Sequence, residues 1–281
     1  MHSNVYTLVT GASEGFGKAL SIECARRGMN LILVALPGEE LKSLKNYIEK
    51  NYAVKAIYFE ADLSNNEECS GLFASIREKE LQVNILINNA GIGGTHGFEE
   101  RDAAYYQRLI ALNVVAPTLL THFFLPMLRA HNRSFILNVS SMAGLFVVPN
   151  KQVYGGTKSY LLAFSRSLRR ELKDKNVSVS TICPGGMNTT LAQIVRNQTL
   201  SGIGRWSVMN PENVASVAIE SMLRGSEIII PGRWNRFIVF LNMVLPGIIK
   251  DILKKRMDKN VFASQHKGVP IPLIENWRKA G

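Results

Sequence analysis

Short apolar runs alternate with longer stretches of helical periodicity along most of the chain. The apolar runs are rich in β-branched residues and predict strands, and the stretches between them predict helices. The predicted strands occupy 5–10, 30–35, 55–60, 84–88, 134–140, 177–183 and 226–232, and the main predicted helices 15–28, 38–51, 65–80, 102–130, 152–174 and 211–224. Continuously apolar strands that alternate with helices are typical of a parallel sheet covered on both faces. The pattern therefore predicts an α/β fold, a doubly wound parallel sheet of about seven strands.

The pattern also predicts one domain followed by an extension. No internal repeat, low-complexity tract or linker sequence precedes residue 232. We expect 1–232 to form this domain, and 233–281 to be a basic amphipathic extension that belongs to it or acts as a membrane-surface or lid element. The last predicted helix of the domain has Asn210 as its N-cap and Pro211 at its first helical position.

Composition supports a folded globular protein, since 46% of the residues are hydrophobic and 20% are charged. Cys24, Cys69 and Cys183 show no CxxC or other ligand spacing, which favours reduced, packed thiols of a cytoplasmic protein. The five histidines are scattered, so we expect no metal site. No run of about 18 apolar residues is present, and a membrane-spanning helix is not expected.

A glycine-rich turn follows the first predicted strand in "TGASEGFG". Gly11 permits a tight turn, Gly15 lets the backbone approach a pyrophosphate, and Gly17 lets the next helix pack on the sheet. That helix presents free N–H groups and a positive dipole end to phosphates. The alternative is an ordinary glycine-rich loop. The position between strand and helix favours a Rossmann-like site for a dinucleotide.

The choice of dinucleotide stays open. An acidic residue about 20 residues after the glycines would bind the adenosine ribose hydroxyls, and an arginine would bind a 2′-phosphate. Ala35 and Leu36 occupy this place, and neither has such a group. Glu14, within the turn, slightly disfavours the 2′-phosphate. We therefore expect NADPH or NADH without choosing between them.

Further motifs follow in a fixed order: "ADL" (61–63), "NNAG" (88–91), Asn113 in "ALNVVAP", "NVSSMAG" (138–144), "YGGTK" (154–158) and "PGGMNT" (184–189). Together with the glycine turn, they resemble the short-chain dehydrogenase/reductase family in its single-domain form. The resemblance covers about residues 5 to 232 and is nearest to lipid ketoreductases and hydroxysteroid dehydrogenases.

The resemblance implies a catalytic tetrad of Asn113, Ser141, Tyr154 and Lys158. Tyr154 would be the general acid in carbonyl reduction and the base in the reverse direction. Lys158, one helical turn later, would lower the pKa of Tyr154 and bind the nicotinamide ribose. Ser141 would hold the substrate oxygen, with Ser140 as its structural neighbour. Asn113 would kink its helix and hold a water that relays protons to Lys158.

The resemblance also implies the cofactor contacts. Asp62 would bind the adenine amino group with Leu63 alongside the ring, "NAG" would line the adenosine side, and Pro184, Gly185 and Thr189 would meet the nicotinamide. The full expected set is Gly11, Ser13, Glu14, Gly15, Phe16, Gly17, Ala35, Leu36, Asp62, Leu63, Asn89, Ala90, Gly91, Tyr154, Lys158, Pro184, Gly185 and Thr189. Each residue also has a structural explanation: the serines end a strand, Asn113 is a buried polar residue, and Asp62 is a helix N-cap.

Residues 189–210 fall where this family carries a mobile substrate lid. Its apolar positions favour a bulky hydrophobic substrate, although core packing explains many of them equally well: Leu191, Ile194, Val195, Ile203, Trp206 and Met209.

Charge is concentrated at the C-terminal end. The net charge is +11, and residues 224–281 hold 11 Lys and Arg against 4 Asp and Glu. An apolar stretch at 237–249 is flanked by basic residues on both sides: Arg233, Arg236, Lys250, Lys254, Lys255 and Arg256. Residues 233–259 suit peripheral contact with an anionic membrane. The alternative is a helical pair over the active-site mouth or against a neighbouring subunit.

The sequence thus predicts an NAD(P)-dependent oxidoreductase that interconverts a ketone and a secondary alcohol on a lipid-like substrate: a 3-oxoacyl, 3-ketosphingoid or steroid compound. The alternative is a non-catalytic dinucleotide-sensing or scaffold protein of the same fold. The resemblance further implies a homodimer or homotetramer formed through 102–130 and 152–174. No nucleic-acid-reading motif is present, so we expect no nucleic acid partner.

Overall fold

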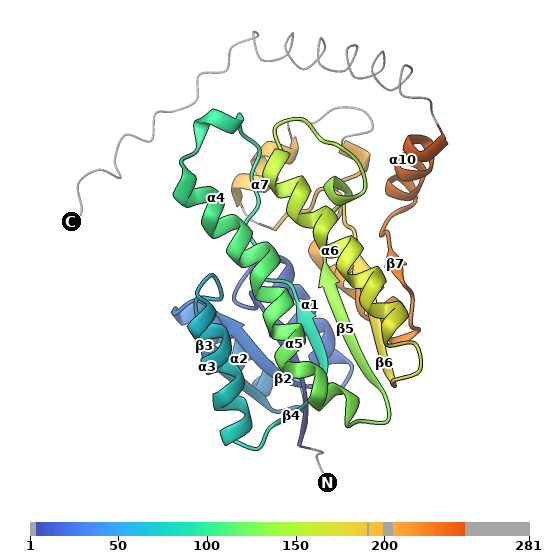
Figure 1. The fold of residues 1–281 in the computed structure, drawn as a ribbon. Coiled ribbons are helices and arrows are strands. Elements are labelled where there is room, and N and C mark those ends of the chain that lie inside the picture. Colours follow the sequence, from blue (N-terminus) through green and yellow to red (C-terminus); the bar gives the residue numbers. More distant parts are fainter. Residues whose placement is uncertain (1–3, 190, 199–204, 245–281) are drawn as a thin grey trace, which may run out of the picture. The chain divides into compact units, whose positions relative to one another are not determined.

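A computed structural model describes residues 4–189, 191–198 and 205–244 (Figure 1). The predicted doubly wound fold is confirmed. Seven parallel strands form one sheet in the order β3-β2-β1-β4-β5-β6-β7. The strands are β1 (Val5–Thr10), β2 (Asn30–Ala35), β3 (Ala56–Glu60), β4 (Gln82–Asn88), β5 (Ser134–Val139), β6 (Val177–Ile182) and β7 (Ile228–Ile229).

Helices cover both faces of the sheet, as the alternating pattern predicts. The α-helices are α1 (Gly15–Arg26), α2 (Glu39–Asn51), α3 (Asn66–Glu78), α4 (Ala103–Ile110), α5 (Ala116–Arg129), α6 (Gln152–Glu171), α7 (Leu191–Gln198), α9 (Pro211–Leu223) and α10 (Arg233–Val244). Three short elements join them: η1 (Phe98–Glu100), η2 (Ala111–Val115) and η3 (Met142–Gly144). Residues up to Val239 belong to one compact unit. The predicted boundary at residue 232 stays a prediction.

Two apolar cores lie on opposite faces of the sheet. The core under α1, α2 and α9 includes Leu20, Leu41 and Ile219. The core under α3, α5 and α6 includes Phe124 and Ile76, and Figure 1 shows α5 and α6 crossing this face side by side. Each fully buried side chain of this size contributes about 1.5–3 kcal/mol through the hydrophobic effect. Because helices cover both faces of the sheet, the strand sequences are continuously apolar.

The last strand is much shorter than predicted. The apolar run at 226–232 predicts a full strand, but only Ile228–Ile229 pair with β6. Pro231 has no N–H to donate to a neighbouring strand, and Gly232 adopts a left-handed backbone conformation with φ +87°. These two residues end β7 and turn the chain into α10.

The predicted helix 102–130 is interrupted at its centre. A π-helical turn, η2, separates α4 from α5 and contains Asn113. Such a turn inserts one extra residue into the helical hydrogen-bond pattern and locally changes the direction of side chains. Asn113 therefore lies in a π-turn, and the expected kink of the helix stays a prediction.

The continuous helical segment Ala103–Arg129 is long and apolar enough to cross a membrane, by length and composition only, with mean hydropathy 1.7 in its most apolar window. The sequence alone did not lead us to expect such a segment. Leu120, Phe124 and Leu128 of this segment lie in the core beneath α5. Packing against the sheet therefore accounts for much of its apolar character.

Helix α9 begins where the sequence predicts, with Pro211 at its first position. Asn210 holds the N-cap position, but its side chain makes no capping hydrogen bond. Asn65 and Asp102 are functional caps by contrast, since their side chains accept hydrogen bonds from Glu67 N and Tyr105 N.

The glycine turn between β1 and α1 depends on close backbone contact. Gly11 and Gly15 have φ +62° and +54°, a conformation that L side chains rarely adopt. A Cβ at Gly17 would lie 1.9 Å from Gly11 O, and one at Gly11 would lie 2.9 Å from Ala90 Cα. The expected tight turn and close helix packing are therefore both present.

We predict opposite stability effects for two Gly→Ala substitutions in helices. G17A forces a methyl group against Gly11 O and should lower the free energy of unfolding by about 2 kcal/mol or more. G71A, in α3, meets nothing within 4 Å and should raise it by about 0.5–1 kcal/mol. Urea unfolding measures both. Equal effects of the two substitutions would contradict the role of Gly17 in packing.

Candidate active site

The predicted motifs converge at one edge of the sheet. Parallel strands end at the same edge, and the glycine turn follows β1, "NNAG" follows β4, "SSMAG" follows β5 and "PGG" follows β6. Ligands of doubly wound sheets bind outside the carboxyl ends of the strands. The sheet order places these four segments next to one another, as the motif order predicts.

The glycine turn is fastened to the end of β4. Asn89 Nδ2 donates to Thr10 O at 2.9 Å and to Gly11 O at 3.1 Å. Thr10 Oγ1 accepts hydrogen bonds from Asn89 N and Ala90 N, both at 3.0 Å. These bonds hold the turn in the open shape that its two left-handed glycines permit. Thr10 is a site residue that the sequence analysis did not single out.

The four residues of the expected tetrad lie together. The Ser141 hydroxyl is hydrogen-bonded to the Tyr154 side chain, and Lys158 Nζ lies 5.8 Å from the centre of the Tyr154 ring. A Cβ at Gly91 would lie 3.0 Å from Asn113 Oδ1 and 3.4 Å from Lys158 Nζ. Gly91 therefore lies directly against the amide and the ammonium, where a side chain would crowd both.

Buried hydrogen bonds hold Lys158 and the neighbouring serines. Lys158 is 5% exposed, and its ammonium donates to Val139 O at 2.8 Å. Ser140 Oγ donates to Lys158 O at 2.7 Å, so this serine supports the helix. Ser141 Oγ accepts from Ala143 N at 3.1 Å at the start of η3. The two serines at the end of β5 thus have different contacts, as expected.

Burial determines the ionisation of the central pair. It raises the pKa of Tyr154 above its ordinary value, although the Ser141 hydrogen bond acts in the opposite direction. Burial also lowers the pKa of Lys158 to about 8. The expectation of a lowered Tyr154 pKa is therefore wrong, because burial penalises the phenolate and the Ser141 hydrogen bond offsets this only in part.

Asn113 connects α4–α5 to α6. Its Oδ1 accepts from Ile92 N at 2.8 Å, and its Nδ2 donates to Ile92 O at 2.9 Å and to Thr157 Oγ1 at 3.1 Å. Thr157 Oγ1 in turn donates to Tyr154 O at 2.7 Å. Thr157 was not expected as a site residue. Its place within "YGGTK" is the signal that could have identified it.

A second lysine also contacts the tyrosine. Lys151 Nζ lies 4.9 Å from the centre of the Tyr154 ring and donates to Gly94 O at 3.1 Å. A cation over an aromatic face is attracted by the ring quadrupole. Lys151 was not expected, since it precedes the motif and is distinguished by its contacts alone.

At the far end of the expected cofactor site, Asp62 is already engaged. Its Oδ1 accepts from Ser64 N at 3.0 Å and from Ser64 Oγ at 2.7 Å, and Arg108 contacts Oδ2 at 3.4 Å. The Ser64 hydrogen bonds chiefly hold the pKa of Asp62 below its ordinary value. Leu63 is 4% exposed and packs in the core beneath α3 and α5, as Phe16 does beneath α1. The side chains of Leu63 and Phe16 therefore pack in the cores on which the expected cofactor site rests.

The "PGG" segment is held by a residue that sequence reasoning missed. Asn235 of α10 is 1% exposed, and its Nδ2 donates to Pro231 O at 2.9 Å and to Ser207 O at 3.3 Å. A Cβ at Gly185 would lie 2.9 Å from the same amide. Pro184 O accepts from Met142 N at 3.0 Å. A Cβ at Gly15 would lie 3.2 Å from Thr189 Cβ, so this segment reaches the glycine turn.

The described part of the expected lid has mixed exposure. Val195 and Trp206 are 57% and 56% exposed, whereas Met209 packs against the core beneath α9. Core packing therefore explains Met209, and the two exposed residues fit the lid interpretation. Ile203 and the Leu191 side chain lie outside the described residues, as do Lys250, Lys254, Lys255 and Arg256.

Within the described residues, no group of His, Cys, Asp or Glu is arranged to hold a metal ion. The site instead fits a dinucleotide. The glycine turn lies beside the α1 N-terminus, and Gly91 places no side chain against the Lys158 ammonium.

Comparison with known proteins agrees with this geometry. The short chain dehydrogenase family model matches residues 6–200. The Gallus gallus hydroxysteroid dehydrogenase-like protein 1 is 29% identical over 239 residues, 84% of this chain and 70% of that protein. The Danio rerio very-long-chain 3-oxoacyl-CoA reductase-B is 29% identical over 200 residues, 69% of this chain and 63% of that protein. This chain therefore matches about two thirds of the length of these relatives.

A solved structure shows the same architecture. The short-chain dehydrogenase from Sphingobium yanoikuyae in complex with NADPH is 25% identical, with a TM-score of 0.73, and the match covers 95% of this chain and 98% of that one. The family match spans more than half of the chain, and the fold and motif order agree with it. The chain belongs to the short-chain dehydrogenase family of NAD(P)-dependent oxidoreductases.

Proposed function

We propose that this enzyme interconverts a ketone and a secondary alcohol on a hydrophobic, lipid-like substrate, with Tyr154 as the general acid and base. The observation that supports the proposal best is the meeting of Tyr154, Ser141, Lys158 and Asn113, with Gly91 beside the last two. A proton donor, a hydroxyl to hold an oxyanion and a cation in one buried place are what carbonyl reduction requires.

The bound nicotinamide supplies or accepts the hydride. The residues of this chain orient the carbonyl and move the proton. Ser141 donates a hydrogen bond to the carbonyl oxygen, and Tyr154 gives its phenolic proton to the same oxygen. Lys158 stabilises the phenolate that remains and binds the ribose hydroxyls. Asn113, held by Ile92 and Thr157, is proposed to hold the water through which a proton returns to Lys158.

The ionisation of Tyr154 and Lys158 suits reduction at neutral pH. The raised pKa of Tyr154 keeps the phenol protonated, so it begins the reaction as an acid. With a pKa of about 8, Lys158 is mostly protonated at pH 7. Both groups are then in the form that carbonyl reduction needs.

The hydrophobic substrate class rests on two observations. Exposed apolar side chains, Val195 and Trp206, lie in the expected lid. The relatives named as a hydroxysteroid dehydrogenase-like protein and a very-long-chain 3-oxoacyl-CoA reductase point to steroid or long-chain acyl ketones. A 3-oxoacyl, 3-ketosphingoid or steroid ketone is therefore proposed for this chain.

We also propose a homodimer or homotetramer formed through α4–α5 and α6. Tyr160 and Phe164 stack at 5.8 Å between ring centres, and Tyr160 is 38% exposed. A stacked pair of rings on α6, of which Tyr160 is exposed and Phe164 half-buried, suits contact with a second copy.

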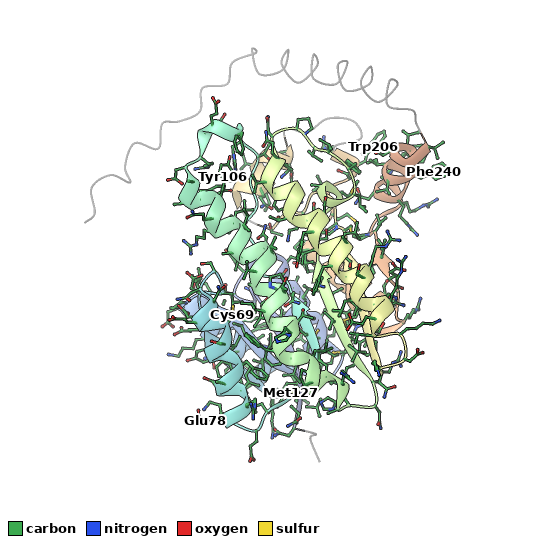
Figure 2. All side chains as sticks on the ribbon, in the orientation of Figure 1. Cys69, Glu78, Tyr106, Met127, Trp206 and Phe240 are labelled. Carbon is green, nitrogen blue, oxygen red and sulfur yellow. The ribbon has the colours of Figure 1, made fainter. Side chains whose placement is uncertain are left out.

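Peripheral membrane contact is proposed for the start of the C-terminal extension. Trp206 and Trp234 lie 4.9 Å apart between ring centres, and both are about half exposed. Arg233 and Arg236 flank Trp234 on α10 and are exposed. Interfacial tryptophans with neighbouring basic residues suit an anionic membrane surface. Figure 2 labels Trp206 beside the first turns of α10.

We expect Y154F to lower kcat by about 10²–10⁴-fold with little change in dinucleotide affinity, because it removes only the transferable proton. A panel of 3-oxoacyl thioesters, steroids and 3-ketosphinganine, run with NADH and NADPH, provides the rates. Y160F, on the exposed side of the same helix, is the matched control and should retain activity. Wild-type turnover by Y154F would contradict the assigned role, and dinucleotide binding without turnover by the wild type would favour a non-catalytic protein.

We expect K158M to abolish turnover yet stabilise the fold at pH 7. Because burial lowers the Lys158 pKa from about 10.4 in the unfolded chain to about 8, keeping this group protonated costs about 3 kcal/mol below pH 8. The loss of the Val139 hydrogen bond offsets part of the gain, leaving about 1–3 kcal/mol.

The difference in the free energy of unfolding between K158M and the wild type depends on pH. The unfolded chain binds more protons between about pH 8 and pH 10.4, so the wild type becomes more stable as the pH rises through this range. The advantage of K158M should therefore disappear by about pH 10.4. Urea unfolding between pH 6.5 and pH 10.5 measures it, with K173M at an exposed lysine as the control. A difference that does not vary with pH would contradict the assignment.

We expect the double substitution R233E/R236E to weaken binding to anionic vesicles at least tenfold, since each arginine near such a surface contributes about 1 kcal/mol. Co-sedimentation with vesicles of phosphatidylcholine alone or with phosphatidylserine measures it. The variant should keep its ketone reductase activity. Equal sedimentation with both kinds of vesicle would contradict the electrostatic attachment.

A further inference from the structure

The turn after β2 is surrounded by carboxylates that come from elsewhere in the chain. At the end of β2 itself, Ala35 is buried and Leu36 is 51% exposed, and neither is ionisable. Glu60 ends the neighbouring strand β3 and pairs with Ala35 in the parallel register. Its Oε1 accepts a hydrogen bond from Gly38 N at 3.3 Å. The sheet thus brings a carboxylate to the place where the sequence of β2 has none.

The register also decides which way this carboxylate points. Paired residues of parallel strands direct their side chains to the same face of the sheet, and neighbouring strands lie about 4.8 Å apart. The Ala35 side chain belongs to the core beneath α1 and α2. Glu60 is therefore on the face that carries the glycine turn and α1. Its side chain is exposed, and among the described residues its second carboxylate oxygen makes no hydrogen bond.

Two further features place carboxylates near this turn: Glu40 at the turn itself, and a neighbouring cleft that Glu60 does not line. A Cβ at Gly38 would lie 2.8 Å from Glu40 Oε2, so the Glu40 carboxylate folds back over the turn. A cleft of about 870 Å³ opens beside the glycine turn between α1 and α2. Among the residues that line it, four are glutamates and one is a lysine: Glu14, Glu39, Glu40, Glu212 and Lys18.

The basic residue on the adenine side of this corner is already paired. Arg108 contacts Asp62 Oδ2 at 3.4 Å, and Ser64 holds the other carboxylate oxygen. Recruiting Arg108 to a phosphate would break this ion pair and leave Asp62 with less support.

We propose that this enzyme selects the non-phosphorylated dinucleotide, NADH or NAD⁺, with Glu60 accepting hydrogen bonds from the adenosine ribose hydroxyls. Ribose hydroxyls are donors and suit a carboxylate, whereas a 2′-phosphate carries a charge of about −1.5 to −2 at neutral pH. Glu14 and Glu40 add repulsion at the same corner. The inference rests on the dinucleotide site of the proposed function and decides the cofactor that this site takes.

Titration of the full chain with NADH and with NADPH, followed by nicotinamide fluorescence, tests the proposal without any ketone. We expect NADH to bind at least tenfold more tightly, a difference of about 1.4 kcal/mol. E60Q should weaken NADH binding at least threefold and leave NADPH binding unchanged or tighter. E40K should tighten NADPH binding. Raising the salt concentration should narrow the NADH–NADPH difference, because ions screen the repulsion.

E78Q is the matched control, because Glu78 is exposed at the end of α3 that Figure 2 labels, away from the carboxyl ends of the strands. It should leave both affinities unchanged. Equal affinities for the two dinucleotides, or tighter binding of NADPH, would overturn this inference and leave the proposed ketone chemistry intact. If neither dinucleotide binds, the inference and the proposed function both fail.

Discussion

The burial of the Lys158 ammonium is the constraint on which the rest of the site depends. The charge is held by Val139 O, and the backbone of its helix approaches η3 so closely that a Cβ at Gly144 would lie 2.7 Å from Lys158 O. Ser140 donates a hydrogen bond to the same carbonyl, and Gly91 places no side chain against the ammonium. Desolvation makes this arrangement costly for folding. The core on both faces of the sheet supplies the stability that offsets this cost.

Much of the fold and the tetrad could be predicted, because both are encoded locally. Apolar runs with both faces buried identify strands to within a residue or two, except at β7, where Pro231 and Gly232 end the pairing. Ordered motifs identify Tyr154 and Ser141. Thr157, Lys151 and Asn235 were missed because their importance lies in contacts with distant segments. The pKa of Tyr154 was predicted in the wrong direction, because sequence shows charges but not burial.

In a parallel sheet, a functional side chain can come from either of two neighbouring strands. The carboxylate proposed to bind the adenosine ribose is an example, because it lies on β3 instead of β2. Fingerprints count residues along the chain and place the ribose acid about 20 residues after the glycines. Hydrogen bonding to the ribose depends on where the carboxylate lies in space, not on its position in the sequence. Because Ala35 and Glu60 are register partners, either strand can present a side chain to the same corner. Counting residues along the chain cannot detect that the carboxylate has moved from β2 to β3. The register of β2 with β3 shows it.

The amide of Asn235 has a practical consequence for where this protein can be shortened. From the first turn of α10, it donates hydrogen bonds to Pro231 O and Ser207 O and packs against Gly185. The family match ends at residue 200, and the alternating pattern ends at 232. A fragment cut at either point would lose this tie and expose Ser207 O. The smallest fragment that keeps the Pro184–Gly185 segment in place must therefore continue beyond residue 235.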